Sequence, residues 1–236
     1  GNRENIVTYM EYDDLGMQTK QYLPFATTNQ LPSGSALNFM NDTLLNPGVI
    51  SQFYVDKYGD GSNAYSETRH ENSPLFRPLE QGAPGYDWKI NPSSDNDHTI
   101  KFQYGTNTSS TEVRMFSVQF DNNDTTNPSL ISNNYYPIGE LTRTMTKEEN
   151  WKPTDGIYGR TYEYKNKSGQ ILLKRISVKD FNKSPQDPNY HDTYYVYDDF
   201  GNLTYVLSPE GSQAILINSN TSNTIDTDIL DVFCYQ

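Results

Sequence analysis

Residues 194–209 read Tyr-Tyr-Val-Tyr-Asp-Asp-Phe-Gly-Asn-Leu-Thr-Tyr-Val-Leu-Ser-Pro. A run rich in Tyr, Val and Thr favours a β-strand, and the Asp198 carboxylate is suited to accept a backbone N–H two residues on and so begin a turn. Gly201 suits the positive-φ position of a type I turn with a bulge. Pro209 ends the following alternation because it cannot donate to a ladder. The stretch therefore predicts a β-hairpin, which must pack on neighbouring strands to be stable.

This hairpin pattern is repeated. Residues 9–24 match it in frame, with a Tyr-Asp-Asp triplet, a glycine three residues after the first aspartate and a proline eight residues after that glycine. A looser third copy covers residues 162–172, with Lys165 after Tyr164 and one extra residue before the glycine. The turn residues of the three copies are Tyr12, Asp13, Gly16, Tyr164, Gly169, Tyr197, Asp198 and Gly201. We expect a structural role for them, because side-chain capping of a turn explains their repetition.

The composition points to the same fold class. Aromatic residues make up 13% of the 236 residues, and 19 of them are tyrosines, which favour a pleated sheet. Further strand candidates are residues 99–104, 112–120 and 141–146. The polar stretches 91–97, 121–134 and 184–189 are interpreted as surface loops. We therefore predict a mostly β fold, in which antiparallel β-hairpin repeats form an extended or curled sheet.

One segment has a helical pattern. Asn46 is a good N-cap and Pro47 suits the first helical position, while the apolar residues between them and Gly59 fall on one face. A helix is therefore predicted near residues 47–57, and a weaker helical pattern precedes it, so that one or two short helices are expected near residues 35–57. We expect residues 1–236 to form a single mostly-β module, with the polar stretch 121–134 as the candidate boundary.

Two sets of residues resemble a known family. Tyr197-Asp198-Asp199-Phe200-Gly201-Asn202-Leu203 matches in full the Tyr-Asp-x-x-Gly-(Asn/Arg)-Leu signature of YD repeats, also called RHS repeats, and residues 12–16 match its first half. The segments that resemble the uncharacterised N-terminal domain of Bacteroidetes RHS-repeat proteins are residues 22–25, 63–68, 73–75, 77–85, Trp88 and 98–104. Together with the YD units, the resemblance spans most of the chain.

The resemblance implies a non-catalytic structural module of a large surface-exposed or secreted protein, whose YD repeats form a β-sheet shell. The partners that it implies are the remaining YD repeats of the parent chain, and the location is the cell surface or the extracellular space. Residues 230–236 look like the beginning of another repeat. We therefore expect an unpaired edge strand at this end of the chain.

Charge, hydropathy and cysteine content exclude several classes of protein. The formal net charge is −12, so no nucleic acid is expected as a partner, because an acidic chain repels the phosphate backbone. No run of about 18 apolar residues occurs, and membrane insertion is therefore not expected. The single cysteine, Cys234, supports neither a disulfide framework within the chain nor a cysteine zinc site.

No catalytic or metal-binding motif is found. His70, His98 and His191 lack the spacing of metal ligands, and neither a Gly-x-Ser-x-Gly elbow nor a phosphate-binding loop occurs. Residues 56–67 partly match a calcium-binding loop, but Tyr58, at the third position of that loop, offers no carboxylate. A helix end followed by a turn is the favoured interpretation there. We expect no catalytic residue, no metal and no cofactor.

Four aromatic residues are candidates for ligand binding: Trp88, Trp151, Tyr135 and Tyr136. Flat rings with a polar tip can stack on sugar rings and hydrogen-bond to their hydroxyls, which makes cell-surface glycans the ligand class considered. The favoured interpretation is that these rings stabilise the sheet as cross-strand pairs. A carbohydrate-binding module is therefore the alternative function. A carbohydrate-active enzyme is the second alternative, and it would need two carboxylates that face each other across a groove.

Overall fold

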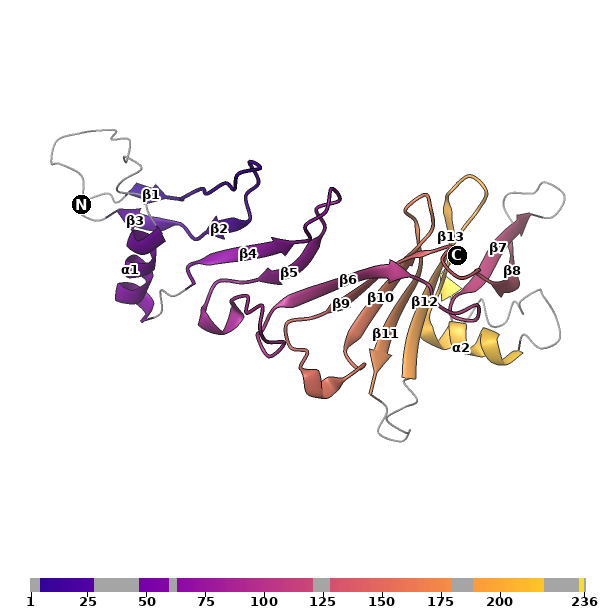
Figure 1. Ribbon diagram of the computed structural model, residues 1–236. Helices are drawn as coiled ribbons and strands as arrows, with labels where there is room; N and C mark the ends of the chain where they lie inside the picture. The colour runs from indigo at the N-terminus through magenta and orange to yellow at the C-terminus, as the bar shows by residue number, and fades with distance from the viewer. Residues whose placement is uncertain are drawn as a thin grey trace. The chain divides into compact units, whose positions relative to one another are not determined.

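The computed structural model describes residues 5–27, 47–59, 63–120, 128–179, 189–218 and 234–235 (Figure 1). These residues belong to two compact units: residues 1–102 with 148–154, and residues 103–147 with 155–236. The prediction of a mostly β, antiparallel fold with few short helices is confirmed. The weaker helical pattern predicted before residue 47 lies outside the described residues, as does most of the stretch 184–189.

The described part of the first unit contains a short strand pair, an antiparallel sheet and one α-helix. β1 (Asn5–Val7) pairs with β3 (Phe25–Thr27). The sheet has the order β2 (Lys20–Tyr22), β4 (Tyr65–His70), β5 (Pro78–Gly82) and β6 (Ile100–Thr106), and β6 continues into the second unit. A 3-10 helix, η1 (Tyr86–Trp88), lies between β5 and β6.

The predicted helix is present as α1 (Pro47–Tyr58). Its Ile50 is fully buried and packs with Tyr22, Phe25 and Ala64 in the core of the first unit. The Tyr54 hydroxyl donates a hydrogen bond to the backbone oxygen of Pro24 at 2.6 Å. The apolar face that the sequence pattern indicates is therefore the face that joins this helix to the strands.

The second unit is a meander of antiparallel strands. After the end of β6 come β9 (Thr142–Lys147), β10 (Arg160–Lys165), β11 (Ile171–Val178), β12 (Asn189–Tyr197), β13 (Leu203–Leu207) and β14 (Cys234–Tyr235), and from β9 onward each strand pairs with the next (Figure 1). A short 3-10 turn, η3 (Pro153–Asp155), precedes β10. Sequence neighbours are thus also neighbours in the sheet, as consecutive hairpins require.

One row of side chains crosses four strands of this meander. Tyr164, Leu173, Tyr194 and Leu207 are successive cross-strand partners in β10 to β13, and none of the four is more than 4% exposed. Since alternate residues of a strand share a face, this row defines the core face of the sheet.

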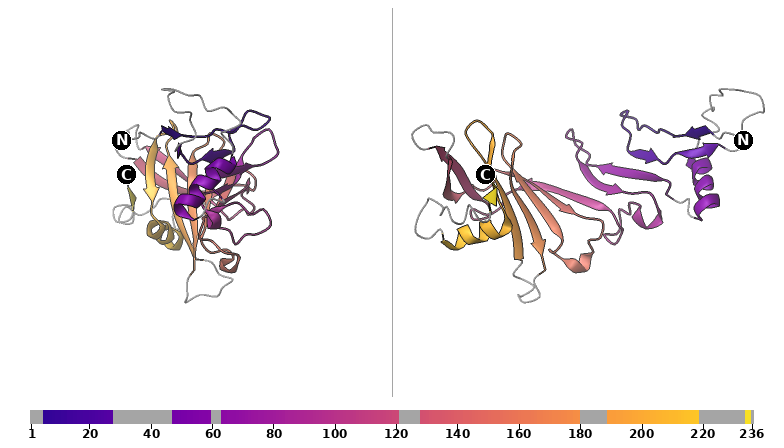
Figure 2. Two further views of the ribbon diagram at one scale, coloured as in Figure 1. Left: turned by 90° about the vertical axis from the view of Figure 1, so that its left-hand side faces the viewer. Right: turned by 180° about the vertical axis from the view of Figure 1, so that it is seen from behind.

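Two further elements complete that core. The hairpin of β7 (Arg114–Phe120) and β8 (Pro128–Tyr135) contributes Leu130, and α2 (Pro209–Asn218) contributes Ile215 and lies beside β12 and β13 (Figure 2). The interpretation of residues 121–134 as a loop was wrong for residues 128–134, which lie in β8. Residues 121–127 lie outside the described part of the chain.

The helix α2 begins at Pro209, which the sequence pattern predicted only as the end of a strand. Ser208 accepts a hydrogen bond on its Oγ from the backbone N–H of Gly211 at 3.2 Å, which is the geometry of an N-cap, and Pro209 is the first helical residue. Glu210 stands in the first turn, where a negative charge is favourable. The proline that ends the β13 pairing therefore also starts a helix.

Candidate functional site

The turn between β12 and β13 is built by one carboxylate and one glycine. Asp198 Oδ1 accepts hydrogen bonds from the backbone N–H groups of Phe200 at 3.0 Å and Asn202 at 2.8 Å. Gly201 has φ +86° and donates its N–H to the Asp198 backbone oxygen at 3.0 Å. The pKa of Asp198 is lowered, first by the hydrogen bond that the Asn202 side-chain amide donates to Asp198 Oδ2 at 2.9 Å and then by the backbone hydrogen bonds. The turn is therefore held by the side chain that begins it.

The same hydrogen bonds occur in the other two copies. Asp13 Oδ1 accepts from the residues two and four positions on, at 3.0 and 2.8 Å, and Gly16 has φ +74°. In the third copy Asn166 Oδ1 accepts from Ser168 and Gln170, each at 3.0 Å, and Gly169 has φ +81°. An asparagine amide oxygen thus replaces the aspartate carboxylate.

The position of Asn166 changes the alignment of the third copy. Counting back from the glycine, Asn166 stands at the place of Asp198, and Lys165 stands at the place of Tyr197. The ladder irregularity also falls before the same residue in both hairpins, between Tyr164 and Lys165 in one and before Tyr197 in the other. There is therefore no extra residue in the turn, and Tyr164 belongs to the core face instead.

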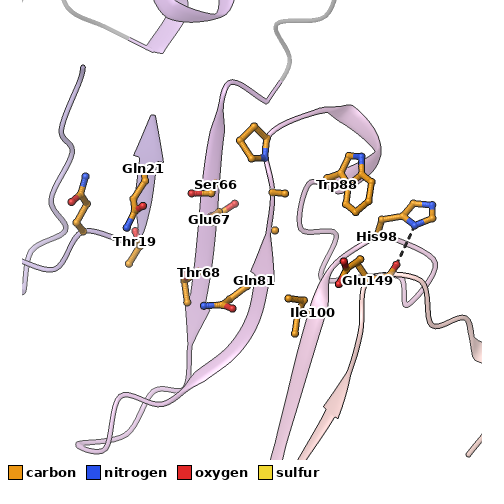
Figure 3. Close-up of a pocket in the computed structure, with 14 residues that line it drawn as sticks. Thr19, Gln21, Ser66, Glu67, Thr68, Gln81, Trp88, His98, Ile100 and Glu149 are labelled. Carbon is orange, nitrogen blue, oxygen red and sulfur yellow. Dashed lines mark hydrogen bonds between the residues drawn. The ribbon is translucent and has the colours of Figure 1, made fainter. Parts of the chain in front are cut away.

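A groove lies on the sheet of the first unit, with a volume of about 370 Å³. We call it the Trp88 groove (Figure 3). It is lined by Gln18, Thr19, Gln21, Ser66, Glu67, Thr68, Gln81, Gly82, Ala83, Pro84, Trp88, His98, Ile100 and Glu149. The strand register explains its polar floor, since Gln21 pairs with Ser66, Thr68 with Gln81, and Gln81 with Ile100, so that these residues share one face of the sheet.

Several polar side chains on the floor of the Trp88 groove have no hydrogen-bond partner among the described residues. Among the residues that the structure describes, the side chains of Gln21, Ser66, Thr68 and Gln81 form no hydrogen bond with one another or with other residues. Each amide has two donor hydrogens and an acceptor oxygen, and each hydroxyl both donates and accepts. These groups are available to a ligand rich in hydroxyls.

The wall of the groove depends on two glycines and one asparagine. A Cβ on Gly82 would lie 2.8 Å from the Trp88 backbone oxygen, and Gly85 has φ +115°. The buried Asn63 donates from its side-chain amide to the Ala83 backbone oxygen at 3.0 Å and accepts the Gly85 N–H on its own backbone oxygen at 2.9 Å. The loop that carries Trp88 is therefore held close to the sheet.

Trp88 and His98 stand together at one end of the groove (Figure 3). Their ring centroids are 5.4 Å apart with an interplanar angle of 42°, and 39% of Trp88 is exposed. His98 donates from Nδ1 to the Glu149 backbone oxygen at 3.1 Å, because a carbonyl can only accept. The orientation of His98 is thus fixed by the segment that contains Glu149.

The opposite face of the same strands carries a buried ion cluster. Glu80, 2% exposed, accepts hydrogen bonds from Arg69 at 2.9 Å, Thr99 at 2.8 Å and Lys101 at 2.7 Å. Burial alone would raise the pKa of Glu80, but the hydrogen bonds from Lys101, Thr99 and Arg69 outweigh it and lower the pKa to about 2. This cluster joins β4, β5 and β6 beneath the Trp88 groove.

The other predicted aromatic residues lie elsewhere. Trp151 is 9% exposed and so contributes to a core. Tyr135, at the end of β8, and Tyr136 belong to the second unit, whereas Trp88 belongs to the first. Tyr136 lines a smaller polar hollow of about 180 Å³, together with Asn166 and Asp198 of the hairpin turns. The four aromatic residues do not form one described site.

Sequence reasoning missed the polar groups of the Trp88 groove. The alternation of Ser66 and Thr68 with larger side chains, and Gln21 between Lys20 and Tyr22, indicated polar strand faces. The pairing of these faces across three strands has no signal in a single sequence.

Metal-ligand clusters and membrane-spanning helices are both missing from the described residues. Within these ranges, His, Cys, Asp and Glu side chains do not gather into a group of three or more that could hold a metal ion. No described helix combines the length and the apolar character that a bilayer span requires. The calcium-loop match at residues 56–67 includes residues 60–62, which lie outside the described part.

Comparison with known families places the groove within a recognised sequence unit. Residues 1–106 match the model of a domain of unknown function (DUF6443). Every residue that lines the Trp88 groove except Glu149 lies within this match. The chain has no match among curated proteins.

Proposed function

We propose that this chain is a non-catalytic structural module of a large surface-exposed or secreted YD-repeat protein, in which it builds part of a β-sheet repeat array. The observation that carries the proposal is the turn that Asp13, Asn166 and Asp198 each form with the same backbone hydrogen bonds. A chain that uses one turn repeatedly extends a sheet by one hairpin at a time. Repeat arrays grow in this way because each unit contacts mainly its neighbours.

The packing of the second unit supports this proposal. An isolated hairpin is marginally stable, and here each strand of the row from Tyr164 to Leu207 supplies one buried side chain to its neighbours. β14 pairs with β13 and adds a further strand to the series. The partners that we propose are the remaining YD repeats of the parent chain. The cell surface or the extracellular space as the location rests on the resemblance to exported RHS-repeat proteins.

The experiment that tests this proposal uses the full-length product of the gene that encodes this chain. We expect cryo-electron microscopy to show the β10–β13 meander continued by hairpins with the same turn. We also expect a membrane-impermeant biotin reagent to label the protein on intact cells. A product without further repeats, or one that is labelled only after cell lysis, contradicts the proposal.

One feature of the Trp88 groove bears on the alternative that the protein is a carbohydrate-active enzyme. Glu67 and Glu149 both line the Trp88 groove, and glycoside hydrolysis would require their carboxylates to face each other across it. We expect no release of reducing ends when the protein is incubated with neutral oligosaccharides. Release that is abolished by Glu67→Gln or Glu149→Gln would make the module an enzyme.

A further inference from the structure

We propose that the Trp88 groove binds a neutral saccharide, with the Trp88 ring as the stacking surface and the strand side chains as hydrogen-bond partners. This ligand-binding role goes beyond the structural role proposed above and does not depend on it. It concerns only residues of the first unit, and all of them line one hollow.

The first observation is an exposed aromatic ring at the wall of a groove. Trp88 keeps 39% of its surface in contact with solvent, in a loop that Asn63 binds at Ala83 and Gly85 and in which the Trp88 N–H donates to the Gly85 backbone oxygen at 3.2 Å. The exposed part of the indole leaves apolar surface in contact with water, and covering that surface is favourable. The apolar C–H face of a pyranose ring would cover it, as flat aromatic surfaces at binding sites are usually covered.

The second observation is the chemistry of the groove floor. Gln21, Ser66, Thr68 and Gln81 offer amide and hydroxyl groups that form no hydrogen bond to other residues in the described part of the chain. They stand on adjacent strands, whose side chains are about 5 Å apart. A saccharide presents alternating donors and acceptors on neighbouring ring carbons, and such a ligand can engage several of these groups at once.

The third observation is the charge of the lining, which selects the class of saccharide. The lining residues include Glu67 and Glu149 but neither lysine nor arginine. Anionic ligands such as phosphates, uronic acids and sulfated or sialylated sugars would meet like charge, with no lysine or arginine among the lining residues to offset the repulsion. A neutral saccharide meets no such penalty.

The size and rigidity of the groove are consistent with a short saccharide. Its volume of about 370 Å³ falls at the small end of the range of about 300–1,000 Å³ that is typical of small-molecule sites. The floor consists of paired strands and the wall is held by the hydrogen bonds of Asn63. A site that is already formed loses little conformational entropy on binding.

The test is a glycan array that carries neutral, sulfated and sialylated oligosaccharides, probed with the 236-residue protein. Titration calorimetry with the strongest neutral oligosaccharide on the array then gives a dissociation constant. We expect binding to neutral saccharides, weakened about tenfold or more by Trp88→Ala and less by Trp88→Phe, which keeps an aromatic surface. Gln81→Ala, at the floor of the groove, is expected to weaken binding as well.

The matched control is Tyr86→Ala. Tyr86 belongs to the same 3-10 helix as Trp88 and is 60% exposed, but it does not line the groove. We expect this variant to bind like the wild type. Circular dichroism and thermal unfolding show whether each variant is folded, and Gln81→Ala tests the site even if Trp88→Ala is unstable.

Tryptophan fluorescence supplies an independent readout. The chain has two tryptophans, and Trp151 is buried, so a ligand that stacks on Trp88 should change an emission that Trp88→Phe removes. A blank array obtained with folded protein overturns the proposal. Binding only to anionic glycans or to peptides, or binding that persists unchanged in folded Trp88→Ala and Gln81→Ala, overturns it too.

Discussion

The Tyr164 hydroxyl donates a hydrogen bond to Oε1 of Glu112 at 2.7 Å and so joins two residues that are 52 positions apart in the chain. The other carboxylate oxygen of Glu112 accepts the backbone N–H groups of Thr108 and Ser109. Burial would raise the pKa of Glu112, but these hydrogen bonds and the charge of Arg143 outweigh it and lower the pKa. The core strand β10 is thereby tied to the loop before β7.

We expect Tyr164→Phe to lower the free energy of unfolding by about 1–3 kcal/mol, because it removes a hydrogen bond to a charged, mostly buried carboxylate. Urea unfolding at pH 7 measures the change. Tyr162→Phe is the matched control, since Tyr162 lies on the same face of β10 and its hydroxyl forms no hydrogen bond to another described residue. Equal losses in the two variants would show that the bond to Glu112 contributes nothing.

The three equivalent turns predict which substitutions the glycines tolerate. Gly169 has φ +81° and open space where an added Cβ would lie, so Gly169→Ala is opposed by backbone strain alone. We expect a loss of about 1–2 kcal/mol and a smaller loss for Gly169→Asn, because asparagine enters the left-handed region more readily. Thermal unfolding compares the two variants.

Gly105→Ala serves as the control for this series. Gly105 lies in β6 without a positive φ, and its nearest neighbour to an added Cβ is the end of the flexible Arg143 side chain at 3.5 Å. We expect this variant to be neutral or slightly stabilising. If Gly169→Asn proves as costly as Gly169→Ala, backbone strain is not the reason for the glycine.

The Glu80 cluster predicts a dependence of stability on pH. The folded pKa of Glu80, about 2, lies below the ordinary value of 4.5. A lowered carboxylate pKa contributes stability that is present above the unfolded pKa and is lost as the pH falls through the folded one. We therefore expect the stability difference between the wild type and Glu80→Gln to be full at pH 7 and to shrink between about pH 5 and pH 2. Urea unfolding across this range measures it, and a difference that does not change with pH contradicts the assignment.

Gly82 predicts the sensitivity of the Trp88 wall. An added Cβ would lie 2.8 Å from the Trp88 backbone oxygen and 3.1 Å from Ile90 Cγ1. We expect Gly82→Ala to cost about 1–3 kcal/mol, as overpacking does, and to shift the tryptophan emission. The neighbouring Ala83, which is exposed, gives the control Ala83→Ser, which we expect to stay within about 0.5 kcal/mol of the wild type. Unchanged emission in Gly82→Ala would mean that the loop does not depend on this glycine.

Local patterns in the sequence predicted the elements whose physics is local. The helix of residues 47–58 follows from a proline at its first position and an apolar face, and the turn at Asp198 follows from an aspartate and a glycine three residues apart. The third turn was misaligned because its acceptor is an amide, Asn166, and Tyr164 took the place of the expected tyrosine. The residue that caps the turn must supply a side-chain oxygen as acceptor, but this oxygen need not belong to a charged carboxylate.

Features that depend on distant pairing could not be predicted. β8 is a polar segment that becomes a strand only by pairing with β7. The helix α2 was missed for another reason, because its Ser-Pro-Glu start is a local signal that was interpreted only as the end of a strand. Trp88 was identified as a candidate from its residue type. The floor of its groove required the register of β2, β4 and β5, which no local pattern contains.

Each of the three equivalent turns has two residues that fix its geometry and two residues at its tip that do not. In each turn the oxygen-bearing residue and the glycine supply the fixed geometry, while the two residues between them face outward, with Leu15 78% and Phe200 84% exposed. The strand pairing of the sheet therefore does not depend on which residues occupy the two tip positions of each turn. In practical terms the tips are conjugation sites: with Cys234, the one cysteine of the sequence, replaced by serine, Asp199→Cys gives a single attachment point for a dye or an antigen at an exposed residue outside the ladder.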